Sequence, residues 1–125
     1  MGAGDVGTED YRINAQHPAD GVIVIQASGE IDITNSLAFK ERLFGELDCA
    51  AALVVLDLDG AERVDTTGLS VIVELAKRCR GEDRELAMVC SKGRVRHALA
   101  VTGLDQMIAT HATLDEALDC DDPAS

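Results

Sequence analysis

The chain has 125 residues, which is the length of one domain and is enough to bury a hydrophobic core without disulfides or metals. Its formal net charge of −12 repels nucleic acids and anionic membranes, and its aromatic content of 2% offers no platform for stacking bases. We therefore expect a partner that is a protein, with no nucleic acid and no membrane, and an interior of aliphatic side chains.

Both ends of the chain differ in composition from its middle. Residues 1–10 are small, glycine-rich and acidic, and residues 121–125 are similar, so we expect both ends to be flexible. The start of the chain lacks the basic and apolar regions of a signal peptide, and no apolar run approaches the ~18 residues of a membrane span. We expect a cytoplasmic protein with a single domain over residues 11–120.

Two strands are predicted at the start of this domain. Residues 11–16 alternate between apolar and polar side chains, and residues 22–27 form a β-branched run. The residues between them, 17–21, read His-Pro-Ala-Asp-Gly. This pattern predicts an antiparallel hairpin with a long turn.

Helices and strands alternate after the hairpin. Apolar residues at helical spacing predict a helix over residues 35–47, a continuous apolar run predicts a buried strand over 53–58, and a second helical stripe covers 67–80. The apolar side of the first helix is expected to contain Phe39, Leu43 and Leu47, with Leu37 and Phe44 alongside. Cys79 and Cys90 are expected to be reduced thiols that fill the core.

The last third of the chain contains shorter elements. We expect a strand over residues 86–90, a helix over 95–102 that Gly103 ends in a left-handed conformation, and a weak strand over 107–109. Thr113 and Glu116 have the spacing of a capping box, which predicts a short final helix.

This order of elements defines the α/β class. We predict a mixed sheet of four to five strands with an N-terminal hairpin and about four helices packed on it. The strands 22–27 and 53–58 should be parallel, so the segments that follow them, 29–32 and 59–67, should meet at the carboxyl edge of the sheet. In open α/β sheets, sites form at this edge.

The polar residues expected at this edge are Asp32, Asp65, Thr66 and Thr67. A threonine hydroxyl can cap the helix that follows, and one threonine is sufficient for that purpose. Two interpretations of the pair therefore stay open. Either one threonine is the cap and the other fills space, or one hydroxyl is held exposed at the positive end of the helix, where it can receive a phosphoryl group.

Three segments of the sequence carry a resemblance to a known family: GEID at 29–32, LVVLDLDGAERVDTTGLSVIVELAKRC at 53–79 and LAMVCSKGRVRHALAVTGLDQMI at 86–108. Together they resemble the STAS domain, in particular the stand-alone anti-sigma factor antagonists (anti-anti-sigma factors) of bacteria. The resemblance extends from about Tyr11 to Asp119. Its most specific motif, Asp-Ser-[Ser/Thr]-Gly-Leu-Gly, corresponds to Asp-Thr-Thr-Gly-Leu-Ser at residues 65–70.

The resemblance implies a phosphorylation switch. In the family, the hydroxyl residue directly after the aspartate is phosphorylated by a serine/threonine kinase that is also the anti-sigma factor, and a protein phosphatase reverses the modification. The matching acceptor is Thr66, with Thr67 as second choice and Asp32 as acidic neighbour. The family usually has serine at the acceptor and glycine in place of Ser70. The implied partner-binding residues are Asp32, Asp65, Thr66, Thr67, Gly68, Leu69 and Ser70.

The resemblance also implies that the protein is a transcription regulator that acts by partner-switching, as a monomer or weak dimer, and not as an enzyme. No cofactor or metal is expected to bind to this chain. No serine or cysteine nucleophile is convincingly spaced with His17, His97 or His111.

Two alternatives differ from this interpretation. One is a magnesium-dependent receiver with Asp57 as acceptor and Glu30 and Asp32 as acidic pair, but a receiver needs a complete strand and helix between its acidic pair and its acceptor. The other keeps the STAS fold and assigns it to a scaffold, or to a ligand-sensing or transport accessory module that does not act on a sigma factor.

Overall fold

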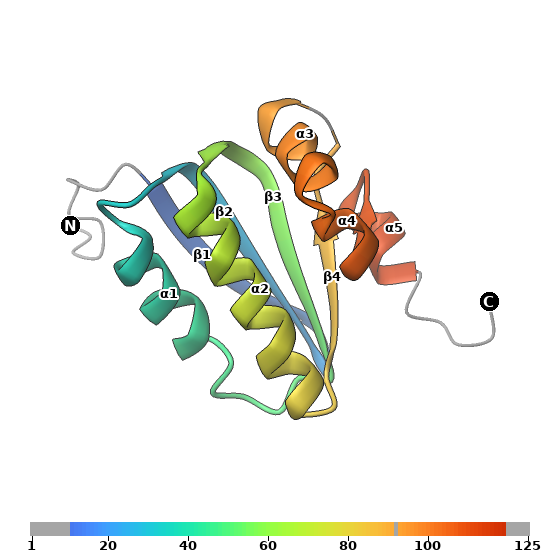
Figure 1. Ribbon diagram of the computed structural model, residues 1–125. Helices are drawn as coiled ribbons and strands as arrows, with labels where there is room; N and C mark the ends of the chain where they lie inside the picture. Colours follow the sequence, from blue (N-terminus) through green and yellow to red (C-terminus); the bar gives the residue numbers. More distant parts are fainter. Residues whose placement is uncertain (1–10, 92, 120–125) are drawn as a thin grey trace.

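The computed structural model describes residues 11–91 and 93–119 (Figure 1). The two ends expected to be flexible, 1–10 and 121–125, lie outside the described residues, as do Lys92 and Cys120.

The described chain forms an α/β domain around a five-stranded mixed sheet in the order β1-β2-β3-β4-β5 (Figure 1). β1 is antiparallel to β2, and the remaining neighbours are parallel. The strands are β1 (Tyr11–Ala19), β2 (Val22–Ile31), β3 (Leu53–Val64), β4 (Glu85–Val89) and β5 (Ala109–His111). The helices are α1 (Ser36–Gly45), α2 (Thr66–Gly81), α3 (Gly93–Thr102), α4 (Leu104–Met107) and α5 (Leu114–Asp119). The predicted fold class and the N-terminal hairpin are confirmed.

The hairpin turn is shorter than the sequence pattern predicted. β1 continues through His17 and Pro18 to Ala19, and the turn consists of Asp20 and Gly21. Gly21 has a φ of 79°, a conformation that costs glycine little. Proline is tolerated here because β1 is an edge strand and the register shifts between Gln16 and Ala19.

β2 and β3 are also longer than predicted, since both continue to the carboxyl edge. The register shifts between Gln26 and Ser28, and again between Gly29 and Glu30, so the two strands stay paired up to Ile31 and Val64. The segment that begins at Asp59 is therefore the end of a strand and not a loop. This extension brings the ends of β2 and β3 to the same point in space.

The sheet is covered on both faces. The larger core lies under α1 and α2, which lie side by side in Figure 1, and it includes apolar residues of α3 and α4. On the opposite face, Ala117 of α5 packs with Val24, Leu53 and Val55. The alternation along β3 supplies both cores, as predicted for a central strand.

The C-terminal elements agree with the sequence pattern except for β5. Gly103 has a φ of 80° and precedes the one-turn helix α4, which takes up Met107 and moves the strand from 107–109 to Ala109–His111. The predicted capping box is formed in part. The Thr113 hydroxyl accepts from the Glu116 N–H, but the Glu116 carboxylate accepts from the N–H of Ala112, the residue before the cap.

The buried cysteines behave as predicted. Cys79 and Cys90 are core residues without a disulfide partner. Burial raises the pKa of the Cys90 thiol to about 11, and burial also raises the pKa of Cys79. Both thiols are therefore protonated at neutral pH and unreactive as nucleophiles.

Candidate functional site

The segments after β2 and β3 converge at the carboxyl edge, as the parallel pairing predicted. The Asp65 N–H donates to the Ile31 carbonyl at 3.0 Å, and the Ile33 N–H donates to Oδ2 of Asp65 at 3.2 Å. We use the term rim for the two segments joined in this way, residues 32–35 and residues 65–70. The rim is the candidate site.

The residue that caps α2 is Asp65, and the prediction that a threonine hydroxyl accepts from the free helix N–H groups is wrong. Oδ1 of Asp65 accepts from the N–H groups of Thr67 at 2.9 Å and Gly68 at 3.2 Å. A carboxylate suits this position because it accepts hydrogen bonds and carries the charge that the helix N-terminus favours. The threonine hydroxyls are therefore not needed to accept from the first N–H groups of α2.

The two threonines differ in what their hydroxyls do. The Thr67 hydroxyl donates to Oδ1 of Asp65 at 2.6 Å and is half-buried, so it strengthens the cap. Thr66 is exposed, and within the described residues its hydroxyl has no hydrogen-bond partner. Ser70 is exposed one turn later and donates to the Thr66 carbonyl at 3.0 Å.

Gly68 and Leu69 lie beneath this surface and not on it. Leu69 is 8% exposed and belongs to the core. A Cβ atom at Gly68 would lie 2.7 Å from Cγ1 of Val64 and 2.8 Å from Cγ2 of Ile31, so glycine lets α2 approach the strand ends closely. These two residues position the rim, and their side-chain positions are not available to a partner.

Asp32 is held in a tight turn at the other half of the rim. Its Oδ1 accepts from the N–H and the hydroxyl of Thr34, at 3.0 and 2.5 Å, which is the pattern of an Asx-turn. Asn35 completes the turn, because it accepts from the Asp32 N–H and donates to the Glu30 carbonyl. The loop is thus fixed by its own side chains.

Both rim carboxylates have a lowered pKa. For Asp32 the cause is the hydrogen bonds from Thr34, which outweigh burial and the negative charge of Asp65. Partial burial raises the pKa of Asp65, but the bonds from Thr67, Gly68 and Ile33 together lower it further. Both groups are therefore ionised at neutral pH, and the rim is negatively charged.

Replacing Asp65 with alanine is expected to lower the free energy of unfolding at neutral pH by about 1–2 kcal/mol, because the cap of α2 is lost. The pKa of Asp65 is lower in the folded chain than in the unfolded one, so its contribution is complete above the ordinary aspartate pKa of about 4. It is lost as the pH falls through the folded value. The free energies of unfolding of the wild type and Asp65→Ala, measured in urea from about pH 7 to pH 3, should differ less as the pH falls.

The matched control for this prediction is Asp48→Ala, since Asp48 is exposed and its carboxylate has no hydrogen bond in the described part of the chain. This substitution is expected to change the free energy of unfolding by no more than about 0.5 kcal/mol. A difference for Asp65→Ala that is constant over the whole pH range would contradict the role of its charge.

Sequence reasoning missed two exposed apolar side chains at the rim. Ile33 is 72% exposed, and Leu37, which was expected on the apolar side of the first helix, is 67% exposed. Periodicity alone did not separate Leu37 from Phe39 and Leu43. A signal for their exposure was available in the sequence. Residues 33 and 37 lie on either side of three polar residues, 34–36, and they precede Phe39 and Leu43, which cover the sheet.

The structure does not bring together the acidic residues of the receiver alternative. Glu30 pairs with Arg63, whereas Asp57 pairs with Gln26, further down the sheet. Among residues 11–91 and 93–119, no group of three or more His, Cys, Asp and Glu side chains is arranged to hold a metal ion.

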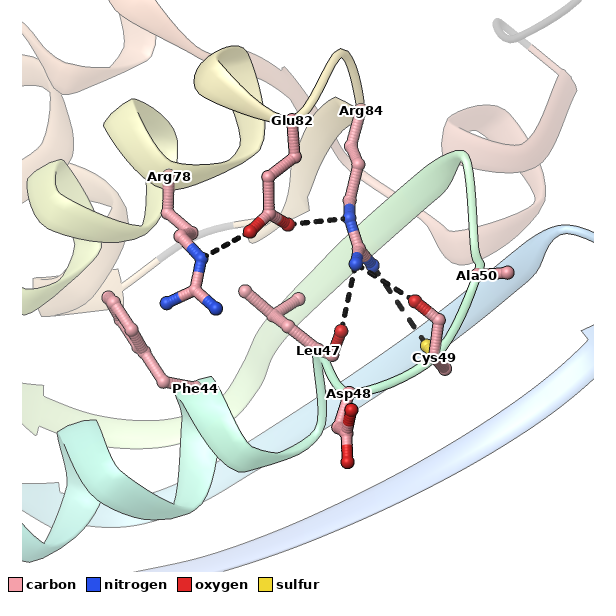
Figure 2. A pocket seen from close by; sticks show the side chains of 8 residues that line it. All are labelled: Phe44, Leu47, Asp48, Cys49, Ala50, Arg78, Glu82 and Arg84. Carbon is pink, nitrogen blue, oxygen red and sulfur yellow. Dashed lines mark hydrogen bonds and ion pairs between the residues drawn. The ribbon is translucent and has the colours of Figure 1, made fainter.

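A hollow of about 460 Å³ lies at the opposite end of the molecule, between the end of α1 and the end of α2 (Figure 2). Arg84 is one of the residues that line it. The guanidinium donates to the carbonyls of Leu47 and Cys49, each at 2.8 Å, and forms an ion pair with Glu82. Arg84 therefore ties the connection before β3 to the end of α2.

Comparisons with known proteins agree with this fold. The family model described as "STAS domain" matches residues 13–117. The anti-sigma-F factor antagonist RsfB of Mycobacterium tuberculosis is 30% identical over 101 residues, which cover 79% of this chain and 80% of RsfB. The crystal structure of an anti-sigma factor antagonist from Mycobacterium paratuberculosis has a TM-score of 0.81 and 25% identity, covering 88% of this chain and 92% of that one.

A second structure shows the same fold at lower identity. The Bacillus cell fate determinant SpoIIAA, in its phosphorylated form, has a TM-score of 0.65 and 15% identity and covers 86% of this chain and 97% of that one. The chain belongs to the STAS domain family. RsfB and the Mycobacterium paratuberculosis protein are both named as anti-sigma factor antagonists, and neither name describes an enzyme. Within the described residues, no helix is long and apolar enough to cross a membrane.

Proposed function

We propose that this protein is an anti-sigma factor antagonist that binds an anti-sigma factor kinase, frees a sigma factor, and is switched off when the kinase phosphorylates Thr66. The kinase supplies the ATP and magnesium, and a protein phosphatase restores the unmodified form. Since sigma factors act in the cytoplasm, the proposal places the protein there.

One observation carries the choice of acceptor. Of the two adjacent threonines, Thr66 is exposed with a hydroxyl that binds nothing in the described chain, whereas the Thr67 hydroxyl is bound to the capping carboxylate of Asp65. Phosphorylation at Thr67 would break the cap, whereas phosphorylation at Thr66 leaves it intact. SpoIIAA, which shares this fold, was solved in a phosphorylated form, so the fold accommodates a modified state of the kind proposed here.

The partner is expected to contact the exposed part of the rim. Asp32, Thr66 and Ser70 offer side chains to it, while Asp65 and Thr67 hold the rim in shape and Gly68 and Leu69 support it from below. A phosphate at Thr66 adds about −1.5 to −2 charges to a surface that already carries two ionised carboxylates. Repulsion and desolvation at the interface then exceed the gain of about 0.3–1 kcal/mol at the helix end.

The test is to incubate the protein with each purified anti-sigma factor kinase of its source organism and ATP, and to map the modified residue by mass spectrometry. The expected result is one phosphate on Thr66 with one of the kinases. If none of the kinases binds or phosphorylates the protein, the proposed function is overturned. If the phosphate is found on Thr67, the assignment of the acceptor is overturned.

A further inference from the structure

Two of the four large apolar side chains that are exposed in the described residues belong to the junction between β2 and α1. Ile33 is 72% exposed and lies within the rim, and Leu37, in the first turn of α1, is 67% exposed. The backbone of Ile33 is bonded to Asp65, the residue that caps α2 and precedes Thr66, and Leu37 follows four residues later on α1. The other two, Val101 and Met107, are on α3 and α4.

The segment that presents Ile33 is fixed before any partner binds. Asp32 accepts from Thr34, Asn35 bonds to both Asp32 and Glu30, and Asp65 accepts from the Ile33 N–H. An apolar side chain on such a loop loses little conformational freedom on binding, which favours affinity. Burial of both side chains in a partner removes apolar surface from water, the main favourable contribution to association.

The charge around the pair selects the kind of partner. Asp32 and Asp65 flank Ile33, and neither forms an ion pair with a cationic side chain in the described part of the chain. Oδ2 of Asp32 accepts no hydrogen bond there. These carboxylates suit a surface that presents lysine or arginine.

The same charge disfavours two other occupants. A second copy of this chain, docked through the same face, places carboxylates against carboxylates on molecules that each carry a formal charge of −12. An anionic membrane surface is repelled for the same reason.

We infer that Ile33 and Leu37 form the apolar anchor of the interface with the anti-sigma factor kinase, and that they fill a hollow of the kinase bordered by cationic side chains. This inference rests on the proposed function. The anchor supplies affinity, Asp32 steers the encounter, and Thr66 carries the switch, so the three contributions are separable by mutation.

The experiment compares four proteins: the wild type, the double variant Ile33→Ala/Leu37→Ala, the variant Asp32→Asn, and Val101→Ala as a control. Val101 is 70% exposed, which matches the exposure of the anchor residues at a remote place. Binding to the kinase that phosphorylates the wild type is measured by surface plasmon resonance in ADP, so that no phosphoryl group is transferred. Circular dichroism and thermal melting verify that each variant is folded.

The double variant is expected to bind at least about tenfold more weakly, mainly through faster dissociation. Asp32→Asn keeps the oxygen that accepts from Thr34, and it is expected to slow association and flatten its salt dependence. Val101→Ala is expected to bind like the wild type.

Each other result has a defined meaning. If the wild type binds and is phosphorylated while the folded double variant binds equally well, the anchor is overturned and the proposed function stands. If Val101→Ala loses as much affinity as the double variant, the effect is not specific to the rim and the anchor is also overturned. If no kinase binds the wild type, the proposed function fails and the inference fails with it. A wild-type dimer that the double variant cannot form, detected by sedimentation, would assign this face to a second copy.

Discussion

Thr66→Glu is expected to bind the anti-sigma factor kinase at least about 100-fold more weakly than the wild type, a loss of about 2.8 kcal/mol. The substitution places a carboxylate beside Asp32 and Asp65, whose lowered pKa values keep both ionised at neutral pH. A buried charge without a partner costs several kcal/mol, and the phosphate itself, with about twice the charge, is expected to cost more. A shift of the complex with the kinase from 99% bound to 1% bound requires a loss of about 5.5 kcal/mol in binding free energy.

The fold should not be affected by this change. Thr66 is exposed at the first position of α2, where a negative charge is mildly favourable, so the free energy of unfolding is expected to stay within about 1 kcal/mol of the wild type. Thr66→Ala should keep the affinity and prevent phosphorylation, and Thr67→Ser, which keeps the hydroxyl that bonds to Asp65, should keep both binding and phosphorylation. Isothermal titration calorimetry measures the affinities. Binding of Thr66→Glu within threefold of the wild type would contradict the proposed switch.

Arg84→Ala is expected to lower the free energy of unfolding by about 2–3 kcal/mol and the melting temperature by about 10 °C. The side chain of Arg84 is 13% exposed and joins two connections of the chain. It donates to the carbonyls of Leu47 and Cys49, in the connection before β3, and pairs with Glu82 at the end of α2 (Figure 2). Alanine leaves both carbonyls without this donor, and charge-assisted bonds of this kind contribute more than neutral ones.

Two further variants isolate the cause. Arg84→Lys keeps the charge but not the planar fork, so about half of the loss is expected to remain. Arg80→Ala, four residues earlier, removes an exposed arginine whose side chain makes no hydrogen bond or ion pair within the described residues, and it should stay within about 0.5 kcal/mol. Urea and thermal unfolding give the values. Equal stability of Arg84→Ala and Arg80→Ala would show that the bonds of Arg84 drawn in Figure 2 contribute nothing.

Much of the fold could be predicted from the sequence because its elements have clear periods. The apolar run at 53–58 and the stripes at 35–47 and 67–80 gave the parallel α/β part, and this part alone brought Asp32 and Asp65 to the same edge. The lengths of β2 and β3 were not predictable, since two register shifts within residues 26–30 keep the strands paired through a segment that has the composition of a loop.

The details of the site depend on contacts between residues distant in sequence. The cap of α2 is itself local, because Oδ1 of Asp65 accepts from residues two and three positions later, and aspartate is a preferred N-cap residue. The bond from Oδ2 to Ile33, 32 residues earlier, has no sequence pattern. The exposure of Ile33 and Leu37 depends on where α1 begins relative to the sheet, which periodicity does not report. A single arginine such as Arg84 has no sequence pattern at all, although it ties two connections together.

The hydrogen bonds that join residues 32–35 to Asp65 have a consequence for how a signal is kept. Because this edge is already stiff, adding a phosphoryl group to Thr66 has little backbone to rearrange, and the two covalent states should have nearly the same shape. In the proposed switch, the record of past kinase activity would then reside in one ester bond and not in a conformation. Thermal motion does not break a phosphoester bond, so the lifetime of the modified state would be determined by the phosphatase that hydrolyses it.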